Sequence, residues 1–371
     1  MNKTRNILFA GILLALTTPM LQYTIGFIKT PPLYGSFNAA NDTILSIDAW
    51  LSGEFQSKKE KYLNENFGFR VFCVRINNQI DFSLFNKTNA FGVEVGKENF
   101  LFEKEYITAY LGNDLVDTDE MHNKLLKLKF IQDTLRKKNK NLILIIAPKK
   151  ASFYPEYFPE KYNDSKKKQS NYNSIITAAR ELKINHIDFN QYFIENKNKS
   201  QYPLYSKHGI HWSMYGSFLA ADSIIKHIEK EKNIDLPDFY YKELQMKEED
   251  GIDYDLGAGL NLLINLKRDS MAYPQVIVGS NKNKKQPGLI VVGDSYYFNL
   301  LHHSFDQCFS NHQFWYYNKN VMMKDNKSES ALKMDLTKEI NEHDIIIIMA
   351  TERNLSALGW GYIERMYEHF K

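Results

Sequence analysis

The sequence has little cysteine, little net charge and no internal repeat. Its two cysteines, Cys73 and Cys308, lie far apart and lack the spacing of metal ligands, so no zinc site is expected. A disulfide between them is compatible with an oxidising compartment, but two buried free thiols are the expectation. The formal charge of +3 is too small to indicate nucleic acid or a strongly anionic partner.

What the chain does contain is enough apolar residues for a packed core. Hydrophobic residues make up 43% and charged residues 25% of 371, which is typical of a soluble globular protein. This length allows one large domain, or one domain with a smaller lobe.

The amino terminus carries one long uncharged stretch, residues 7–28, preceded by Lys3 and Arg5. A helix of that length is about 33 Å long, enough to cross a bilayer core. The basic residues favour a cytoplasmic amino terminus, so the rest of the chain is expected on the extracytoplasmic side of the cytoplasmic membrane. A cleaved signal peptide is the alternative, but no good small-x-small cleavage site follows, and an uncleaved single-pass anchor is favoured.

The remaining chain predicts two parts. Residues 42–110 indicate helices followed by a hairpin at 91–102, and from about residue 118 strands alternate with helices. Such alternation predicts an α/β domain with a mainly parallel sheet flanked by helices. We therefore divide the chain into an anchor (1–29), a linker with a smaller mixed region (30–117) and an α/β domain (118–371). The expected strands are 142–147, 186–189, 276–278, 289–292 and 345–349, and the main expected helices are 117–138, 171–182, 213–230 and 296–309.

The first chemical signal is Ser295, which follows the apolar strand 289–292 in the sequence Gly293-Asp294-Ser295-Tyr296. A serine between a parallel strand and a helix lies at the carboxyl edge of the sheet, where α/β proteins form their sites. Backbone N–H groups there can stabilise an oxyanion, so Ser295 is a candidate nucleophile. The alternative is that Ser295 only caps the helix.

The second signal is His211, which stands beside Trp212 just before the helix expected at 213–230. An imidazole titrates near neutral pH and can take a proton from a serine hydroxyl, so His211 is a candidate general base. The alternative is a histidine that caps the helix or packs against Trp212.

The third signal is the apolar strand 345–349, which is soon followed by Glu352 and Arg353. If this strand runs parallel to the strand before Ser295, both charged residues lie near the same sheet edge. The alternative is a surface ion pair at a strand end.

Taken in order, these features resemble a known family: the SGNH-hydrolase-like proteins of polysaccharide O-acetylation, the alginate O-acetyltransferase type. The resemblance covers most of the chain beyond the anchor. Ordinary secreted esterases of the SGNH fold carry the serine block before the histidine block, whereas here the histidine comes first. The matching segments are ENFGFR at 65–70, VGKENFLF at 95–102, APKK at 147–150, HW at 211–212, GDS at 293–295 and ER at 352–353.

The resemblance implies Ser295 as nucleophile, His211 as its base, and an oxyanion hole that uses the N–H of Ser295 or, our choice, Tyr296. Asp294 and Trp212 would lie near the site. This family usually has Asp-x-His-Trp, in which the aspartate orients the histidine.

Here the aspartate position is Gly209, so the expected carboxylate is missing. Glu352 is the candidate replacement, with His208 and Asp255 as weaker ones and Arg353 as a further residue near the site. A pair of Ser295 and His211 alone, or an inactive relative, are the other interpretations of the departure.

The sequence thus predicts a membrane-anchored, extracytoplasmic O-acetyltransferase that acetylates a cell-surface or secreted polysaccharide through an acetyl-serine. The resemblance implies a multi-spanning membrane partner that delivers the acetyl group, and the serine chemistry needs no cofactor. One rival is a carbohydrate acetylesterase with the same residues and water as acceptor. The other is a non-catalytic component of a polysaccharide assembly complex.

Overall fold

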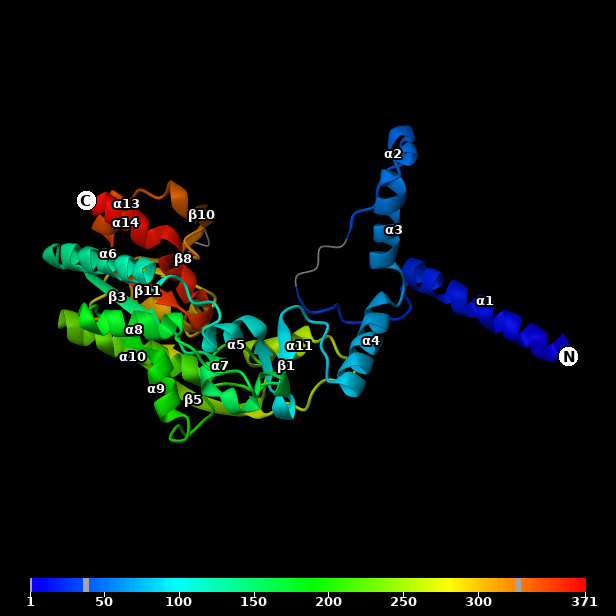
Figure 1. Cartoon of the computed structure of the whole chain (residues 1–371), viewed down its shortest axis with the longest axis horizontal. Coiled ribbons are helices and arrows are strands. Elements are labelled where there is room, and N and C mark those ends of the chain that lie inside the picture. Colours follow the sequence, from blue (N-terminus) through cyan, green and yellow to red (C-terminus); the bar gives the residue numbers. More distant parts are fainter. Residues whose placement is uncertain (1, 36–39, 324–327) are drawn as a thin grey trace. The chain divides into compact units, whose positions relative to one another are not determined.

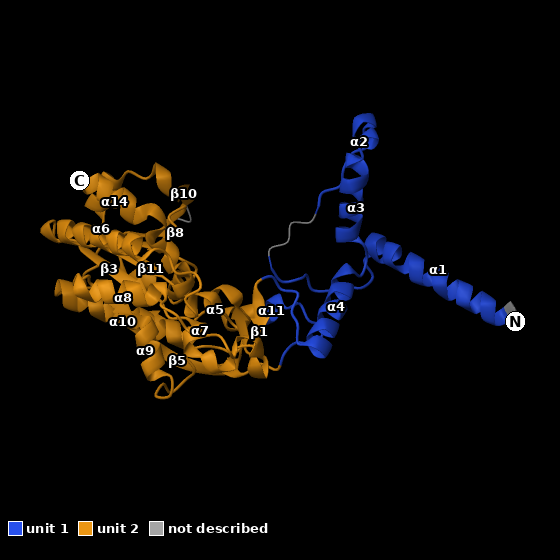
Figure 2. Cartoon of the chain, viewed as in Figure 1, with its two compact units in different colours: residues 1–91, 257–266 blue, residues 92–256, 267–371 orange. Residues whose placement is uncertain are grey.

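The computed structural model describes residues 2–35, 40–323 and 328–371, and its elements are labelled in Figure 1. They form two units: residues 1–91 with 257–266, and residues 92–256 with 267–371 (Figure 2). The boundary falls after Phe91, earlier than residue 118, because the segment 92–117 packs into the second unit. There Leu101 and Ile107 are fully buried, and the Leu101 N–H donates to the carbonyl of Lys207 (3.1 Å).

In the first unit, helix α1 (Asn2–Ile25) contains most of the uncharged stretch, up to residue 25. The segment Lys3–Ile25 is long and apolar enough to cross a membrane, judged by length and composition. The helix ends before residue 28 because Gly26 takes a left-handed conformation (φ 65°), a common helix terminator.

The first unit also contains helices α2 (Ile47–Leu51), α3 (Glu54–Asn66) and α4 (Arg70–Phe85). The single long helix that the spacing of residues 60–85 indicates is divided at Gly68 and Phe69. Phe69 has a φ of 68°, which an α-helix does not allow. Cys73 on α4 is exposed and Cys308 in the second unit is buried, and both are free thiols, so the expected burial is wrong for Cys73.

The second unit is built on a seven-stranded sheet with the order β10-β9-β8-β7-β11-β3-β4. The five strands from β8 to β4 are parallel, and β9 and β10 add an antiparallel edge. The expected α/β class with a mainly parallel sheet is therefore confirmed. The strands are β3 (Asn141–Ile146), β4 (His186–Asp188), β7 (Leu289–Gly293), β8 (His312–Tyr316), β9 (Asn320–Met323), β10 (Ser328–Ser330) and β11 (Ile345–Ala350).

One expected strand lies outside this sheet. Residues 276–278 are the end of β6 (Ser270–Val278), which pairs antiparallel with β5 (Phe239–Glu248) in a separate two-stranded ribbon. The expected hairpin is present as β1 (Val93–Val95) and β2 (Leu101–Glu103), and it is followed by α5 (Lys104–Tyr110).

The central strands are apolar along their whole length because both faces are covered. Every residue of β7 and β11 is buried, and alternate side chains of β3, β7 and β11 pack into a core with the helices on one face. These helices are α6 (Thr118–Lys137), α8 (Asn171–Glu181), α13 (Leu336–Glu342) and α14 (Tyr362–Phe370). Helices α7 (Lys150–Phe153), α9 (Phe189–Asn196), α10 (Met214–Lys232) and α12 (Tyr297–His302) also belong to the unit, and the short helix α11 (Asp255–Gly259) begins in it.

The parallel register decides where the functional segments meet. Gly293 of β7 pairs with Met349 of β11, and Ala350 of β11 pairs with Ile146 of β3. The turns that follow these three strands therefore emerge at one edge of the sheet.

Candidate active site

Ser295 lies in the turn between β7 and α12 and is partly exposed. Its side chain does not cap the helix, because the N-cap residue of α12 is Tyr296 and no side chain caps that end. The hydroxyl instead faces His211: Ser295 Oγ lies 3.2 Å from His211 Nε2.

The other ring nitrogen of His211 meets a carboxylate. Nδ1 lies 3.0 Å from Asp255 Oδ2, and because a carboxylate only accepts, Nδ1 carries the proton and Nε2 is free to accept from Ser295. Asp255 Oδ1 in turn accepts the N–H groups of Ile210 (2.9 Å) and Leu256 (2.7 Å). Ser295, His211 and Asp255 thus form a continuous hydrogen-bonded chain with the arrangement of a serine-hydrolase triad.

Asp255, ranked below Glu352 from the sequence, therefore occupies the position of the missing acid. Glu352 begins the 3-10 segment η7 (Glu352–Gly361), where its buried carboxylate pairs with Lys149 after β3. The sequence could not distinguish the two acids because Asp255 stands 44 residues beyond His211 and reaches it only through tertiary packing.

Gly209 explains why the acid comes from elsewhere. A Cβ atom at this position would lie 2.5 Å from both the carbonyl oxygen of Ile252 and the hydroxyl of Ser206. The segment that carries Asp255 thus fills the space in which a side chain at position 209 would start, and the two ways of supplying a carboxylate exclude each other.

His208 does not join the hydrogen-bonded chain and instead helps to hold the loop before His211. Its Nδ1 pairs with the buried carboxylate of Glu249, which also accepts the N–H of Lys207 (2.8 Å). The Lys150 ammonium donates to the carbonyls of Lys207 (2.6 Å) and Gly209 (2.8 Å). Burial lowers the pKa of Lys150 to about 7, although nearby carboxylates oppose this. Lys150, from the APKK segment, and Glu249 hold this loop in place, a role that the sequence assigned to neither of them.

Asp294 links the serine turn to the turn after β11. Its Oδ2 accepts the backbone N–H and the hydroxyl of Thr351 and the side-chain amide of Asn354, each at 2.8 Å. Its Oδ1 accepts the N–H of Tyr296 at 3.1 Å. The expected oxyanion donor, Tyr296, is therefore engaged, whereas the N–H of Ser295 has no acceptor among the described residues.

The two remaining predicted residues lie close by. Arg353 pairs with Glu103, and its Nε lies 2.7 Å from Glu105 Oε2, so it forms the ion pair that was the alternative interpretation. Burial raises the pKa of Glu103, and the charge and hydrogen bond of Arg353 oppose this rise. Trp212 is fully buried, 5.5 Å from the ring of Tyr296, and serves packing.

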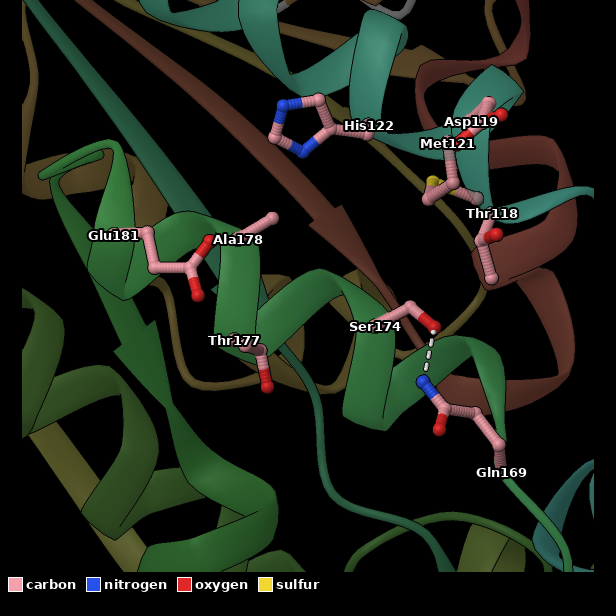
Figure 3. A pocket seen from close by; sticks show the side chains of 9 residues that line it. All are labelled: Thr118, Asp119, Met121, His122, Gln169, Ser174, Thr177, Ala178 and Glu181. Atoms are coloured by element: carbon pink, nitrogen blue, oxygen red, sulfur yellow. Dashed lines mark hydrogen bonds between the residues drawn. The ribbon is translucent and has the colours of Figure 1, made fainter.

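Two cavities of the second unit differ in how close they lie to the Ser295–His211–Asp255 hydrogen bonds. One of about 280 Å³ lies between α6 and α8 and contains none of the triad residues (Figure 3). The other, of about 350 Å³, adjoins the turn before Asp255 and the helix after Ser295. Its lining is Met214, Lys247, Asp250, Gly251, Ile252, Tyr273, Phe298, Asn299 and His302. No group of three or more His, Cys, Asp or Glu side chains in the described part of the chain is placed to hold a metal ion.

Comparison with known proteins gives matches to an AlgX-type family model and to alginate O-acetylases. Residues 93–268 match the family model for the SGNH hydrolase-like domain of the acetyltransferase AlgX, a segment that includes His211 and Asp255 and ends before Ser295. The probable alginate O-acetylase AlgJ of Azotobacter vinelandii is 26% identical over 237 residues, which are 62% of this chain and 54% of that protein. Its counterpart in Pseudomonas aeruginosa is 25% identical over 234 residues, 62% of this chain and 52% of that protein.

Among solved structures, the O-acetyltransferase domain of Pseudomonas putida AlgJ aligns with a TM-score of 0.48 at 19% identity, covering 75% of this chain and 99% of that one. The chain spans about half the length of the curated relatives it matches. The resemblance to SGNH-hydrolase-like proteins of polysaccharide O-acetylation is thereby confirmed.

We predict that Asp255→Asn slows acetylation of Ser295 by p-nitrophenyl acetate by about 10²- to 10⁴-fold, because an amide neither fixes the tautomer of His211 nor stabilises its imidazolium. The rate is measured as the appearance of the acetyl adduct by intact mass spectrometry. Asp250→Asn, an exposed change five residues upstream, should leave it unchanged. Adding Gly209→Asp should not restore it, since position 209 has no room for a side chain. A normal rate in Asp255→Asn, or an equal loss in Glu352→Gln, would return the role to Glu352.

We further predict that Asp253 makes stability depend on pH. Its carboxyl is buried, and burial, with a smaller contribution from the charges of Glu249 and Asp255, raises its pKa to about 7 against the lowering effect of hydrogen bonds from Tyr273 and Met214. The folded state therefore keeps this proton up to about pH 7, whereas the unfolded state releases it near pH 4. Folding binds more protons in that window, so this contribution to stability falls as pH rises from about 4 to 7.

In Asp253→Asn that fall should disappear. The variant should gain stability relative to the wild type between pH 5 and pH 8, by at most about 1.4 kcal/mol for each pH unit in which the wild-type carboxyl titrates. Urea unfolding midpoints at the two pH values measure the difference, with the exposed Asp164→Asn as the control. A constant difference between variant and wild type at both pH values would contradict a raised pKa.

Proposed function

We propose, on the premise of this resemblance to the alginate O-acetylases, that the chain is an extracytoplasmic O-acetyltransferase. It transfers acetyl groups to hydroxyls of a cell-surface or secreted polysaccharide through an acetyl-serine. The observation that carries the proposal is the hydrogen-bonded chain from Ser295 through His211 to Asp255. It removes the main reason for regarding the protein as an inactive relative, namely the glycine at position 209.

In the first step the Ser295 oxygen attacks the carbonyl carbon of an acetyl donor. His211 Nε2 takes the hydroxyl proton as the new C–O bond forms, and Asp255 stabilises the imidazolium. Collapse of the tetrahedral intermediate breaks the bond to the leaving group, which receives the proton from His211. The acetyl group is then esterified to Ser295.

In the second step a sugar hydroxyl takes the place of the leaving group. His211 Nε2 accepts its proton, the sugar oxygen attacks the acetyl carbon, and the bond to Ser295 breaks while the proton returns to the serine oxygen. The carbohydrate product carries the acetyl ester, and the enzyme regains its starting state. Water in place of the sugar gives the esterase reaction, so exclusion of water decides between the two.

The oxyanion of both intermediates needs a donor beside Ser295. The N–H of Ser295 is the better candidate, since the N–H of Tyr296 already donates to Asp294. Tyr296 contributes in another way: its hydroxyl donates to the carbonyl of Ile210 at 2.8 Å and so fixes the residue before His211. For Tyr296 to act as an oxyanion donor, the turn at Asp294 would have to rearrange.

The proposal also covers where the protein lies and where its acetyl groups come from. Helix α1 would anchor the chain in the cytoplasmic membrane with Lys3 and Arg5 on the cytoplasmic side, and the rest of the first unit and the whole second unit would lie outside. The family resemblance further suggests a multi-spanning membrane protein as the source of acetyl groups. The Ser295 chemistry itself uses only side chains of this protein.

The enzymatic proposal predicts a covalent acetyl adduct. Full-length protein in detergent is incubated with p-nitrophenyl acetate, and intact mass is followed with and without an oligosaccharide such as hexamannuronate. Wild type should gain one acetyl group, which the sugar removes faster than water does, with acetylated sugar as the product. Ser295→Ala should gain none, and His211→Ala should react orders of magnitude more slowly.

Ser295→Thr serves as the matched control, because it keeps a hydroxyl but crowds the turn. Adduct formation in Ser295→Ala at the wild-type rate would overturn the assignment of the nucleophile. An adduct that water and sugar remove equally, without acetylated sugar, would support the esterase instead.

The location predicts the labelling of Cys73, which is exposed, whereas Cys308 is buried. A membrane-impermeant maleimide added to intact spheroplasts that express the full chain should label wild type, and Cys73→Ser should remain unlabelled. Labelling that requires lysis of the spheroplasts would place this unit in the cytoplasm.

A further inference from the structure

Four aromatic side chains near Ser295 contact one another in series: Phe298, Tyr316, Tyr317 and Trp360, here called the aromatic row. Ring centroids are 5.3 Å apart for Phe298 and Tyr316, 4.4 Å for Tyr316 and Tyr317, and 5.2 Å for Tyr317 and Trp360. Phe298 is 38% exposed and the other three are partly exposed, unlike the fully buried aromatics of the core. The row thus presents a continuous aromatic surface.

The row lies at the edge of the sheet that carries the triad. Phe298 stands three residues after Ser295, and its N–H donates to the Ser295 carbonyl at 3.1 Å. Tyr317 directly follows β8, and its N–H donates to the carbonyl of Gly293 at 2.9 Å. Trp360 belongs to η7, the segment after β11. Three separate elements therefore bring these rings together at the edge of the sheet from which Ser295 emerges, with Phe298 at the end of the row next to the nucleophile.

The backbone at this place takes conformations that bulky residues rarely adopt. Tyr317, Asn318 and Trp360 have φ values of 51°, 50° and 45°. The side-chain amide of Asn318 donates to the carbonyl of Trp360 at 3.0 Å and ties the two turns together. An aromatic residue in the left-handed region is an outlier, and such strain is concentrated at functional sites. If these positions served only packing, a residue that favours left-handed backbone would fill them without this strain.

We propose that the aromatic row binds the acceptor polysaccharide, with pyranose rings stacked on Tyr317 and Trp360. This inference rests on the proposed acetyl transfer and names the surface that holds its acceptor. The C–H face of a pyranose matches the face of an aromatic ring, while its hydroxyls stay in water or meet polar side chains. A sugar chain bound along the row would reach Ser295 at its Phe298 end, because the N–H of Phe298 donates to the Ser295 carbonyl.

The surface continues beyond the row. Phe298 also lines the cavity of about 350 Å³, to which Lys247, Asn299 and His302 add hydrogen-bonding groups. This cavity has room for a further sugar residue and the polar atoms to orient it. Phe298 is therefore the residue shared by the two parts of the acceptor site.

The first test follows the tryptophans directly. The chain has four, of which Trp212 and Trp315 are fully buried and Trp50 belongs to the other unit. Full-length Ser295→Ala labelled with 5-fluorotryptophan is titrated with hexamannuronate and with cellohexaose, and ¹⁹F spectra are recorded. The resonance that Trp360→Phe removes should shift with at least one sugar. The inference is overturned if neither sugar moves that resonance.

The second test separates acceptor binding from chemistry. Trp360→Asn and Tyr317→Asn remove the rings while keeping a residue that tolerates left-handed backbone. Each should raise the KM for the sugar acceptor by about tenfold and leave acetylation of Ser295 by p-nitrophenyl acetate unchanged. Tyr367→Ala is the matched control and should change neither value. It removes a ring on α14 that contacts Phe130 on α6.

The outcomes distinguish this inference from the proposed function. If wild type forms no acetyl adduct, the proposed function fails whatever the sugars do. If wild type forms the adduct and transfers it, but Trp360→Asn and Tyr317→Asn keep the wild-type acceptor KM, the function stands and the aromatic row is not the acceptor site. Circular dichroism and melting temperature establish that each variant is folded before its kinetics are compared.

Discussion

Parallel pairing of β3, β11 and β7 is the constraint on which the candidate site depends. Because the three strands end in register, the residues that follow them reach one edge: Lys149 and Lys150 after β3, Ser295 after β7 and Thr351 after β11. The carboxylate of Asp294 then joins the last two turns through hydrogen bonds to Thr351 and Asn354. A change of register in β7 would move the serine hydroxyl away from His211 and separate Asp294 from its donors.

The parts predicted from the sequence are those with a local signal. Apolar runs with clear ends identified β3, β7 and β11, and the strand-serine-helix order identified Ser295. Strand β8 was missed because His312 and Gln313 open it, and their burial depends on partners such as Glu339. The acid that orients His211 was misranked for a related reason: no local pattern separates Asp255 from Glu352, and only the packed structure shows which one meets the imidazole.

The buried charges around the site fit a role in positioning rather than in stability. Lys150 donates to backbone carbonyls on both sides of His208, and the carboxylate of Glu249 accepts N–H groups of the same loop. Removing such groups from water costs free energy that their mutual attraction only partly returns. What they provide is a loop with one geometry, and a general base must be held within hydrogen-bond reach of its nucleophile.

The close approach of Gly209 to the carbonyl of Ile252 has a consequence for how such sites are detected. Positions 209 and 255 are linked by packing: a side chain at 209 would meet the carbonyl of Ile252 while the segment 252–255 is in place, and that same segment brings Asp255 to His211. A search for Asp-x-His-Trp would classify this chain as a degenerate copy, although its structure contains a complete hydrogen-bonded triad. The motif alone therefore does not show whether His211 has a carboxylate partner, and the arrangement in space is the better criterion.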